Sequence, residues 1–201
     1  MRGYARSRRA FSTSCGLVVA IATTIAVHSA NLRLYFDPQS STVRLGLLTP
    51  VLSVIALHQS LGLPLGEMEA VFGRELRRLR ALHVLAALAV LAVGALVYVA
   101  VHGATDAVGQ SVRNTAILVG LLLATSTVTG PDAAWVVPVG VVLATYGFGV
   151  DYDGGRPRGW AVLFHAPAPP DVLAGVGFLA IAALLFVVRG PRGARLGDGG
   201  Q

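Results

Sequence analysis

Long apolar stretches alternate with short polar segments along the chain. Six such stretches lie near residues 16–36, 43–63, 81–103, 112–129, 133–150 and 172–188. An α-helix of about 20 apolar residues is long enough to cross the hydrocarbon core of a bilayer. The pattern therefore predicts an all-α fold, a polytopic membrane helix bundle of about six transmembrane helices. We expect one transmembrane domain at 16–189, after a basic N-terminus at 1–15 and before a disordered tail at 190–201.

The composition supports a membrane protein. Hydrophobic residues make up 54% of the 201 residues and charged residues only 13%, whereas about a quarter of the residues of a soluble domain are charged. All 16 basic residues are arginine, and this bias suggests a GC-rich bacterial genome and hence a bacterial cytoplasmic membrane. The net charge of +6 is better explained by arginines at helix ends and against anionic lipid than by nucleic acid. We expect no nucleic-acid partner.

The distribution of arginines predicts the orientation. With six spans, eleven of the 16 arginines lie on the side that holds both termini and the segment 66–80. Cytoplasmic loops are the ones enriched in arginine, so both termini are predicted to be cytoplasmic. The first stretch also resembles a signal peptide, but His28 stands where a small residue is required. A retained anchor is therefore the favoured interpretation.

The segment GEMEAVFGRELRRLR, residues 66–80, is a charged insert between two apolar stretches. At 100° per residue, an apolar stripe forms on one side of a helix, from Met68, Phe72, Leu76, Leu79 and His83. Most of the charges fall on the opposite side. The pattern predicts a short amphipathic helix along the cytoplasmic interface that runs into the third apolar stretch.

Two interpretations of this helix remain open. Its arginines can simply fix the topology and bind lipid, which is the commoner case, or the helix can dock a cytoplasmic ATPase. The residues concerned in either case are Glu67, Arg74, Glu75, Arg77, Arg78 and Arg80.

Four polar residues are expected inside the bundle. His58 and Gln59 lie within the second stretch, where an interhelical hydrogen bond is a more common role than lining a substrate path. Arg113 and Asn114 open the fourth stretch, and an arginine at such a place more often extends to the interface than binds a ligand. The hydroxyls of Thr125–Thr129 can bond back to the preceding turn. Pro50, within the second stretch, predicts a kink.

Catalytic chemistry has no visible basis in the sequence. The chain has no lysine, so it lacks the P-loop lysine that contacts nucleotide phosphates. The five histidines show no metal-ligand spacing, and no serine-hydrolase motif is present. We expect no enzyme activity, no cofactor and no metal site in this chain. Any ATP hydrolysis would belong to a partner.

Several short stretches, taken in order, suggest a family. They are FGRELRRLRALH before the third apolar stretch, SVRNTAILVGLLL at the fourth, AAWVVPVG at the fifth and RPRGWAVLFHAPAPP before the sixth. The layout resembles small six-span actinobacterial membrane proteins identified as permease-like subunits of ABC exporters. The resemblance implies a separate ATP-binding subunit and a second membrane subunit, identical or different.

Two functions are therefore expected from the sequence. The leading hypothesis is an integral membrane subunit of a bacterial ABC-type exporter that relies on a separate ATPase chain. The alternative is a non-transporting membrane accessory or immunity protein. The two differ in whether charge reversal at the basic segment would abolish ATP-dependent export.

Overall fold

The structure is a computed structural model of the whole chain, and it describes residues 10–26, 31–33, 42–44, 49–61, 73–103, 106–149, 151 and 156–191. The described part is all-α apart from one short hairpin. Its six α-helices are α2 (Ala10–Ala26), α3 (Thr49–Leu61), α5 (Gly73–His102), α6 (Asp106–Thr129), α7 (Val136–Phe148) and α8 (Pro169–Arg189). A 3₁₀ turn, η2 (Val162–Phe164), lies between α7 and α8.

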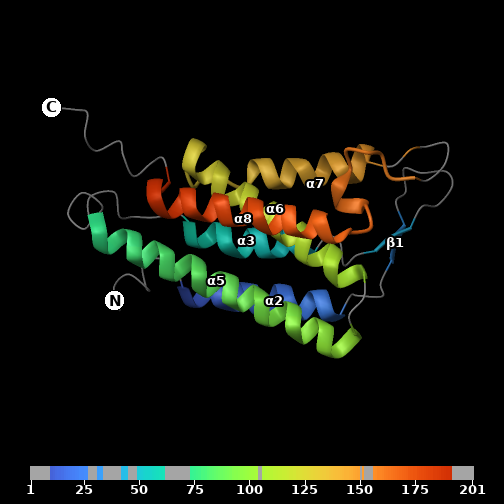
Figure 1. Cartoon of the computed structure of the whole chain (residues 1–201), viewed down its shortest axis with the longest axis horizontal. Coiled ribbons are helices and arrows are strands. Elements are labelled where there is room, and N and C mark those ends of the chain that lie inside the picture. Colours follow the sequence, from blue (N-terminus) through green and yellow to red (C-terminus); the bar gives the residue numbers. More distant parts are fainter. Residues whose placement is uncertain are drawn as a thin grey trace.

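The helices run back and forth along one long axis (Figure 1). The starts of α2 and α5 and the end of α8 lie at one end of the bundle. The short strands β1 (Asn31–Arg33) and β2 (Thr42–Arg44) lie at the other end and pair antiparallel, with Leu32 opposite Val43. The start of α5 extends beyond the other helices at its end.

Among the described residues, three helices are long and apolar enough to cross a membrane: Arg77–Val101 within α5, Val108–Thr129 within α6 and Pro169–Arg189, which is α8. The other apolar helical stretches are shorter, at Thr13–Thr23, Pro50–Gln59 and Val136–Phe148. Helices α3 and α7 have 13 residues each, about 20 Å of rise against a hydrocarbon core of about 30 Å. Six full spans are therefore not confirmed.

The first two predicted spans have wrong boundaries. Helix α2 ends at Ala26, and β1 begins at Asn31, inside the range predicted to be helical as far as residue 36. The second range begins with β2, and α3 starts only at Thr49. The strands hold Arg33 and Arg44, and charged side chains are costly at membrane depth. Helix α2 ends before Arg33 and α3 begins after Arg44, so neither helix includes these arginines.

The predicted kink at Pro50 is also wrong. Pro50 is the second residue of α3, within its first turn. A proline in the first turn removes no helical hydrogen bond, since those N–H groups have no partner within the helix. Pro50 therefore lies where α3 begins and does not bend it.

Residues 73–80 of the charged insert and the third apolar stretch form one continuous helix, α5, which has 30 residues and begins at Gly73. The expected continuation of the insert into the third stretch is therefore present. Residues 66–72 of the predicted amphipathic helix lie outside the described part. Between Gly73 and Gly94 the helix holds no glycine or proline, and its Arg, Leu and Ala residues favour helix. Nothing in this sequence interrupts the helix between the insert and the third apolar stretch, at residues 80 and 81.

Helix α6 is the central helix of the described bundle. Over its most apolar 18 residues α6 is 56% buried, whereas α5 and α8 are each 22% buried. Leu118, Val119 and Leu122 of α6 lie in the apolar core with residues of α2, α3, α7 and α8. Near the end of α6, the predicted back-bonding is confirmed: Ser126 Oγ donates to Leu123 O at 2.7 Å and Thr129 Oγ1 to Thr125 O at 3.0 Å.

Candidate functional site

The most deeply buried charged group among the described residues is Arg113 of α6. Its exposed fraction is 0%, and that of the neighbouring Asn114 is 1%. Arg113 lies two turns inside α6, which begins at Asp106 rather than near residue 112. The burial agrees with the interior position expected for both residues, and Arg113 does not extend to the interface. The structure places both side chains in the interior.

Arg113 is bound to the segment around η2. Its Nη2 atom donates to the carbonyl oxygens of Val162 at 2.6 Å and His165 at 2.9 Å. Its Nε and Nη2 atoms also donate to Asn114 Oδ1, at 3.2 and 3.1 Å. One planar guanidinium thus joins two carbonyls of a distant segment to an amide of its own helix. Nη1 has no hydrogen-bond partner within the described residues.

Two amides complete this polar centre. Asn114 Nδ2 and Gln110 Nε2 both donate to Leu163 O, each at 3.0 Å. Gln110, Arg113 and Asn114 have the spacing i, i+3 and i+4, which places them on one face of α6. Gln110 was not predicted from the sequence, although this spacing within an apolar stretch is a usable signal. We call these three residues and the carbonyls of Val162, Leu163 and His165 the α6–η2 polar centre.

The polar centre satisfies backbone groups of an irregular segment. Carbonyls outside regular helices need hydrogen-bond donors when they are buried. Nearby, the rings of Tyr146 in α7 and Phe164 in η2 meet edge to face, with centroids 4.9 Å apart, and Leu163 is buried. Gly175 of α8 lets Arg113 lie close to the helix, since a Cβ at 175 would be 3.3 Å from Arg113 Cγ. The arrangement positions the η2 segment.

Nothing in this centre indicates catalysis. The hydrogen bonds run from side-chain donors to carbonyl oxygens, a pattern that holds backbone in place and generates no nucleophile. Within the described residues, no group of three His, Cys, Asp or Glu side chains could hold a metal ion. The hydrogen bonds of the described centre hold the η2 segment against α6.

The other two predicted interior residues lie elsewhere. His58 of α3 is half-buried, and its Nδ1 atom has no hydrogen-bond partner in the part of the chain that the structure describes. Gln59 is exposed, so an interior position was the wrong expectation for it. Neither residue lies in the α6–η2 polar centre.

The basic start of α5 divides into exposed and buried residues. Arg77 and Arg78 are exposed, whereas Arg80 is 6% exposed. Arg80 begins the buried stripe of α5 that continues through Val84, Ala87 and Tyr98, at the spacing expected for one helix face. Arg74 and Glu75 lie in the first turn of α5, but their side chains and the whole of Glu67 lie outside the described part.

Arg80 packs against the end of α8. Gly190 has φ of +69°, and a Cβ there would collide with the guanidinium of Arg80. The start of α5 and the end of α8 are therefore in contact at the same end of the bundle. Because Arg80 is buried in this contact, the exposed basic surface among the described residues of α5 consists of Arg77 and Arg78.

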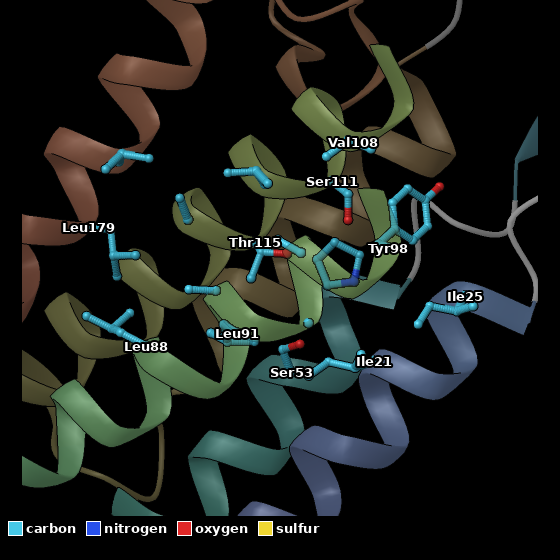
Figure 2. Close-up of a pocket in the computed structure, with 17 residues that line it drawn as sticks. Ile21, Ile25, Ser53, Leu88, Leu91, Tyr98, Val108, Ser111, Thr115 and Leu179 are labelled. Atoms are coloured by element: carbon cyan, nitrogen blue, oxygen red, sulfur yellow. The ribbon is translucent and has the colours of Figure 1, made fainter. Parts of the chain in front are cut away.

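A cavity of about 200 Å³, partly open to the outside, lies between α2, α3, α5, α6 and α8. Its wall is mostly aliphatic, and no charged residue among those described lines it. Four residues with hydroxyls take part: Ser53, Tyr98, Ser111 and Thr115. In Figure 2, Ser111 and Thr115 extend from α6 and Ser53 from α3 toward the space between the helices. The sequence did not predict this cavity.

Comparisons with known proteins complete the description of the site. No family model, curated protein or solved structure matches the chain.

Proposed function

We propose that the chain is a multi-pass protein of the bacterial cytoplasmic membrane. We further propose that it is the membrane subunit of an ABC-type exporter that relies on a separate ATPase chain. A single observation supports the membrane location. Polar side chains are buried inside the bundle, and large apolar side chains are exposed on its outside.

This burial pattern is seen in named residues. Large aliphatic side chains cover the outer faces of α5 and α8, with Leu96 69%, Leu173 72% and Leu184 64% exposed. In contrast, Arg113 and Ser126 are 0% exposed. A monomer in water rarely exposes a large continuous apolar surface. Lipid favours such a surface, and polar groups within a bilayer normally face the bundle interior.

The orientation follows from the charged ends. The start of α5, with exposed Arg77 and Arg78, lies at the same end as the start of α2 and the end of α8. Arginine-rich segments stay on the cytoplasmic side. We therefore assign this end to the cytoplasm and the β1–β2 end to the outer face.

The proposed ATPase contact lies at the start of α5. Here the helix extends beyond its neighbours (Figure 1) and presents two guanidinium groups to solvent. Guanidinium groups bind carboxylates with two parallel hydrogen bonds. An acidic groove on the ATPase is the complementary surface. The contact between Arg80 and Gly190 connects this end of α5 to α8 and so to the bundle.

The test is purification of the tagged chain from its native membrane in mild detergent. We expect a P-loop ATPase to be recovered with it, together with ATP hydrolysis. The double variant Arg77→Glu/Arg78→Glu should release the ATPase. The matched control Arg156→Glu/Arg158→Glu makes the same charge change at the exposed outer end and should retain it.

Recovery of a folded, membrane-inserted chain that never brings down an ATPase would contradict the exporter assignment. The same result would favour the alternative, a non-transporting accessory or immunity protein. In that case charge reversal at Arg77 and Arg78 would alter lipid binding or topology. It would not abolish any ATP-dependent export.

A further inference from the structure

We propose that the cavity between α2, α3, α5, α6 and α8 binds a neutral lipid-like molecule. Such a molecule has an apolar chain and one uncharged group that accepts hydrogen bonds, such as an ester carbonyl. The inference goes beyond the partnership with an ATPase and rests only on the membrane location proposed above.

The wall of the cavity fits an aliphatic chain. Ile21, Leu88, Leu91, Val112 and Leu179 contribute most of the bulk of this wall. A cavity of about 150 Å³ accommodates a benzene ring, so the 200 Å³ available here holds about eight carbon atoms on the same scale. A membrane lipid is larger than that. Part of the molecule therefore enters the cavity, and the rest stays in the bilayer on the open side.

Small residues of α5 make the space. Ala92, Gly94 and Ala95 line the cavity on this helix. At Gly94 the two walls meet, because a Cβ on this residue would lie 2.5 Å from Cδ1 of Ile21. Helices α5 and α2 therefore touch at this point.

Three hydroxyls in the wall face the cavity: those of Ser53, Ser111 and Thr115 (Figure 2). Among the described residues their side chains make no hydrogen bond. The hydroxyls of Thr127 and Thr145, in contrast, bond to carbonyls of their own helices at 2.7 Å. An unpaired hydroxyl among apolar groups is unfavourable. A ligand with a hydrogen-bond acceptor would satisfy these groups.

The ligand is neutral because no described residue of the wall would compensate a charge. In the part of the chain that the structure describes, the lining includes no Arg, His, Asp or Glu. Arg113 lies on another face of α6 and is bonded to the η2 segment. An ionised headgroup inside this cavity would therefore be desolvated without a counter-charge.

The direct test uses the full chain in nanodiscs of phosphatidylcholine, with no ATPase present. The probe is a monoacylglycerol with a photoactivatable diazirine on the acyl carbon nearest the ester. We expect labelled peptides from Leu88–Tyr98 of α5 and Val108–Ala116 of α6, with labelling reduced by unlabelled monoacylglycerol. Labelling spread over the exposed faces of α5 and α8 and insensitive to competitor would overturn the proposal, since it would reflect bulk lipid only.

A matched pair of variants on α5 tests the position. Ala95 lines the cavity, whereas Ala89 is exposed on the outer face of the same helix. Ala95→Trp should abolish the part of the labelling that unlabelled monoacylglycerol reduces. Ala89→Trp should leave that part intact. If Ala95→Trp does not fold, as judged by gel filtration, the smaller Ala95→Leu takes its place. Equal labelling of both members of the pair would contradict the proposal.

The hydroxyls are tested separately. In Ser111→Ala/Thr115→Val we expect monoacylglycerol to compete about five- to tenfold more weakly, the effect of losing one hydrogen bond. Competition by hexadecane should be unchanged, and so should the behaviour of the control Thr127→Val. Unchanged competition by monoacylglycerol would overturn the role of the hydroxyls. Because the assay contains no ATPase, failure of the exporter assignment would not alter these results.

Discussion

The guanidinium of Arg113 donates a hydrogen bond of 2.6 Å to the carbonyl oxygen of Val162, 49 residues further along the chain. This bond joins the central helix to the irregular segment between α7 and α8. With Asn114 and Gln110, which both reach Leu163 O, it holds that segment against one end of the bundle. Two consequences of this network can be measured by unfolding.

Removal of Arg113 should destabilise the chain strongly. Arg113→Met removes the side-chain donor to the carbonyls of Val162 and His165 and the contacts to Asn114 Oδ1, at a cost of about 2 to 4 kcal/mol. Arg113→Lys should restore little of this, because an ammonium lacks the planar fork that reaches several acceptors at once. Thermal unfolding in detergent checks the result. Arg78→Met, on the exposed face of α5, is the control and should change stability by less than about 0.5 kcal/mol.

The two amides of the polar centre should differ in their effects. Gln110→Ala removes one of two donors to Leu163 O, so we expect a loss of about 0.5 to 1.5 kcal/mol. Asn114→Ala should cost more, because it also removes the oxygen that accepts from Arg113. The same unfolding assay gives the order. Equal effects would argue against a shared network.

A side chain at Gly190 should meet the guanidinium of Arg80, which must then shift. Gly190→Ala incurs both the left-handed backbone and a collision with the guanidinium. Gly103→Ala is the control, since Gly103 has φ of +80° with nothing near its Cβ position, and it should cost about 1 to 2 kcal/mol. We expect Gly190→Ala to cost more than this.

A double variant tests whether the contact with Arg80 causes the additional cost of Gly190→Ala. Arg80→Ala should relieve part of the penalty of Gly190→Ala, and the cycle should show a coupling of about 0.5 to 3 kcal/mol. Simple additivity would mean that the collision is avoided by movement of the arginine.

The proposed orientation is checked by cysteine labelling from outside. In a Cys15→Ser background, Trp160→Cys reports the η2 end and Arg78→Cys the start of α5, both at exposed positions. We expect a membrane-impermeant maleimide to label Trp160→Cys in spheroplasts and Arg78→Cys only after permeabilisation. The reverse pattern would place the start of α5 outside and contradict the proposed ATPase contact.

The amino-acid sequence alone determined the helical class and the positions of the long apolar helices. Helices α5, α6 and α8 were predicted because long apolar runs favour helix whatever their neighbours are. The boundaries of the first two stretches could not be predicted. Hydropathy averages over a window, and Asn31–Arg33 and Thr42–Arg44 become strands by pairing with each other. Such pairing is a non-local interaction.

For the polar residues, too, the sequence determined one part and the tertiary structure decided the rest. The sequence singled out Arg113 and Asn114, but only the tertiary structure decided that Arg113 binds carbonyls of the η2 segment. The sequence could not distinguish Arg78 from Arg80, because both carry the same charge. In the structure Arg80 is buried where it packs against Gly190, and Arg78 is exposed. The cavity depends on five helices at once. Composition and periodicity describe one segment at a time, whereas burial, hydrogen-bond partners and empty space depend on which segments meet.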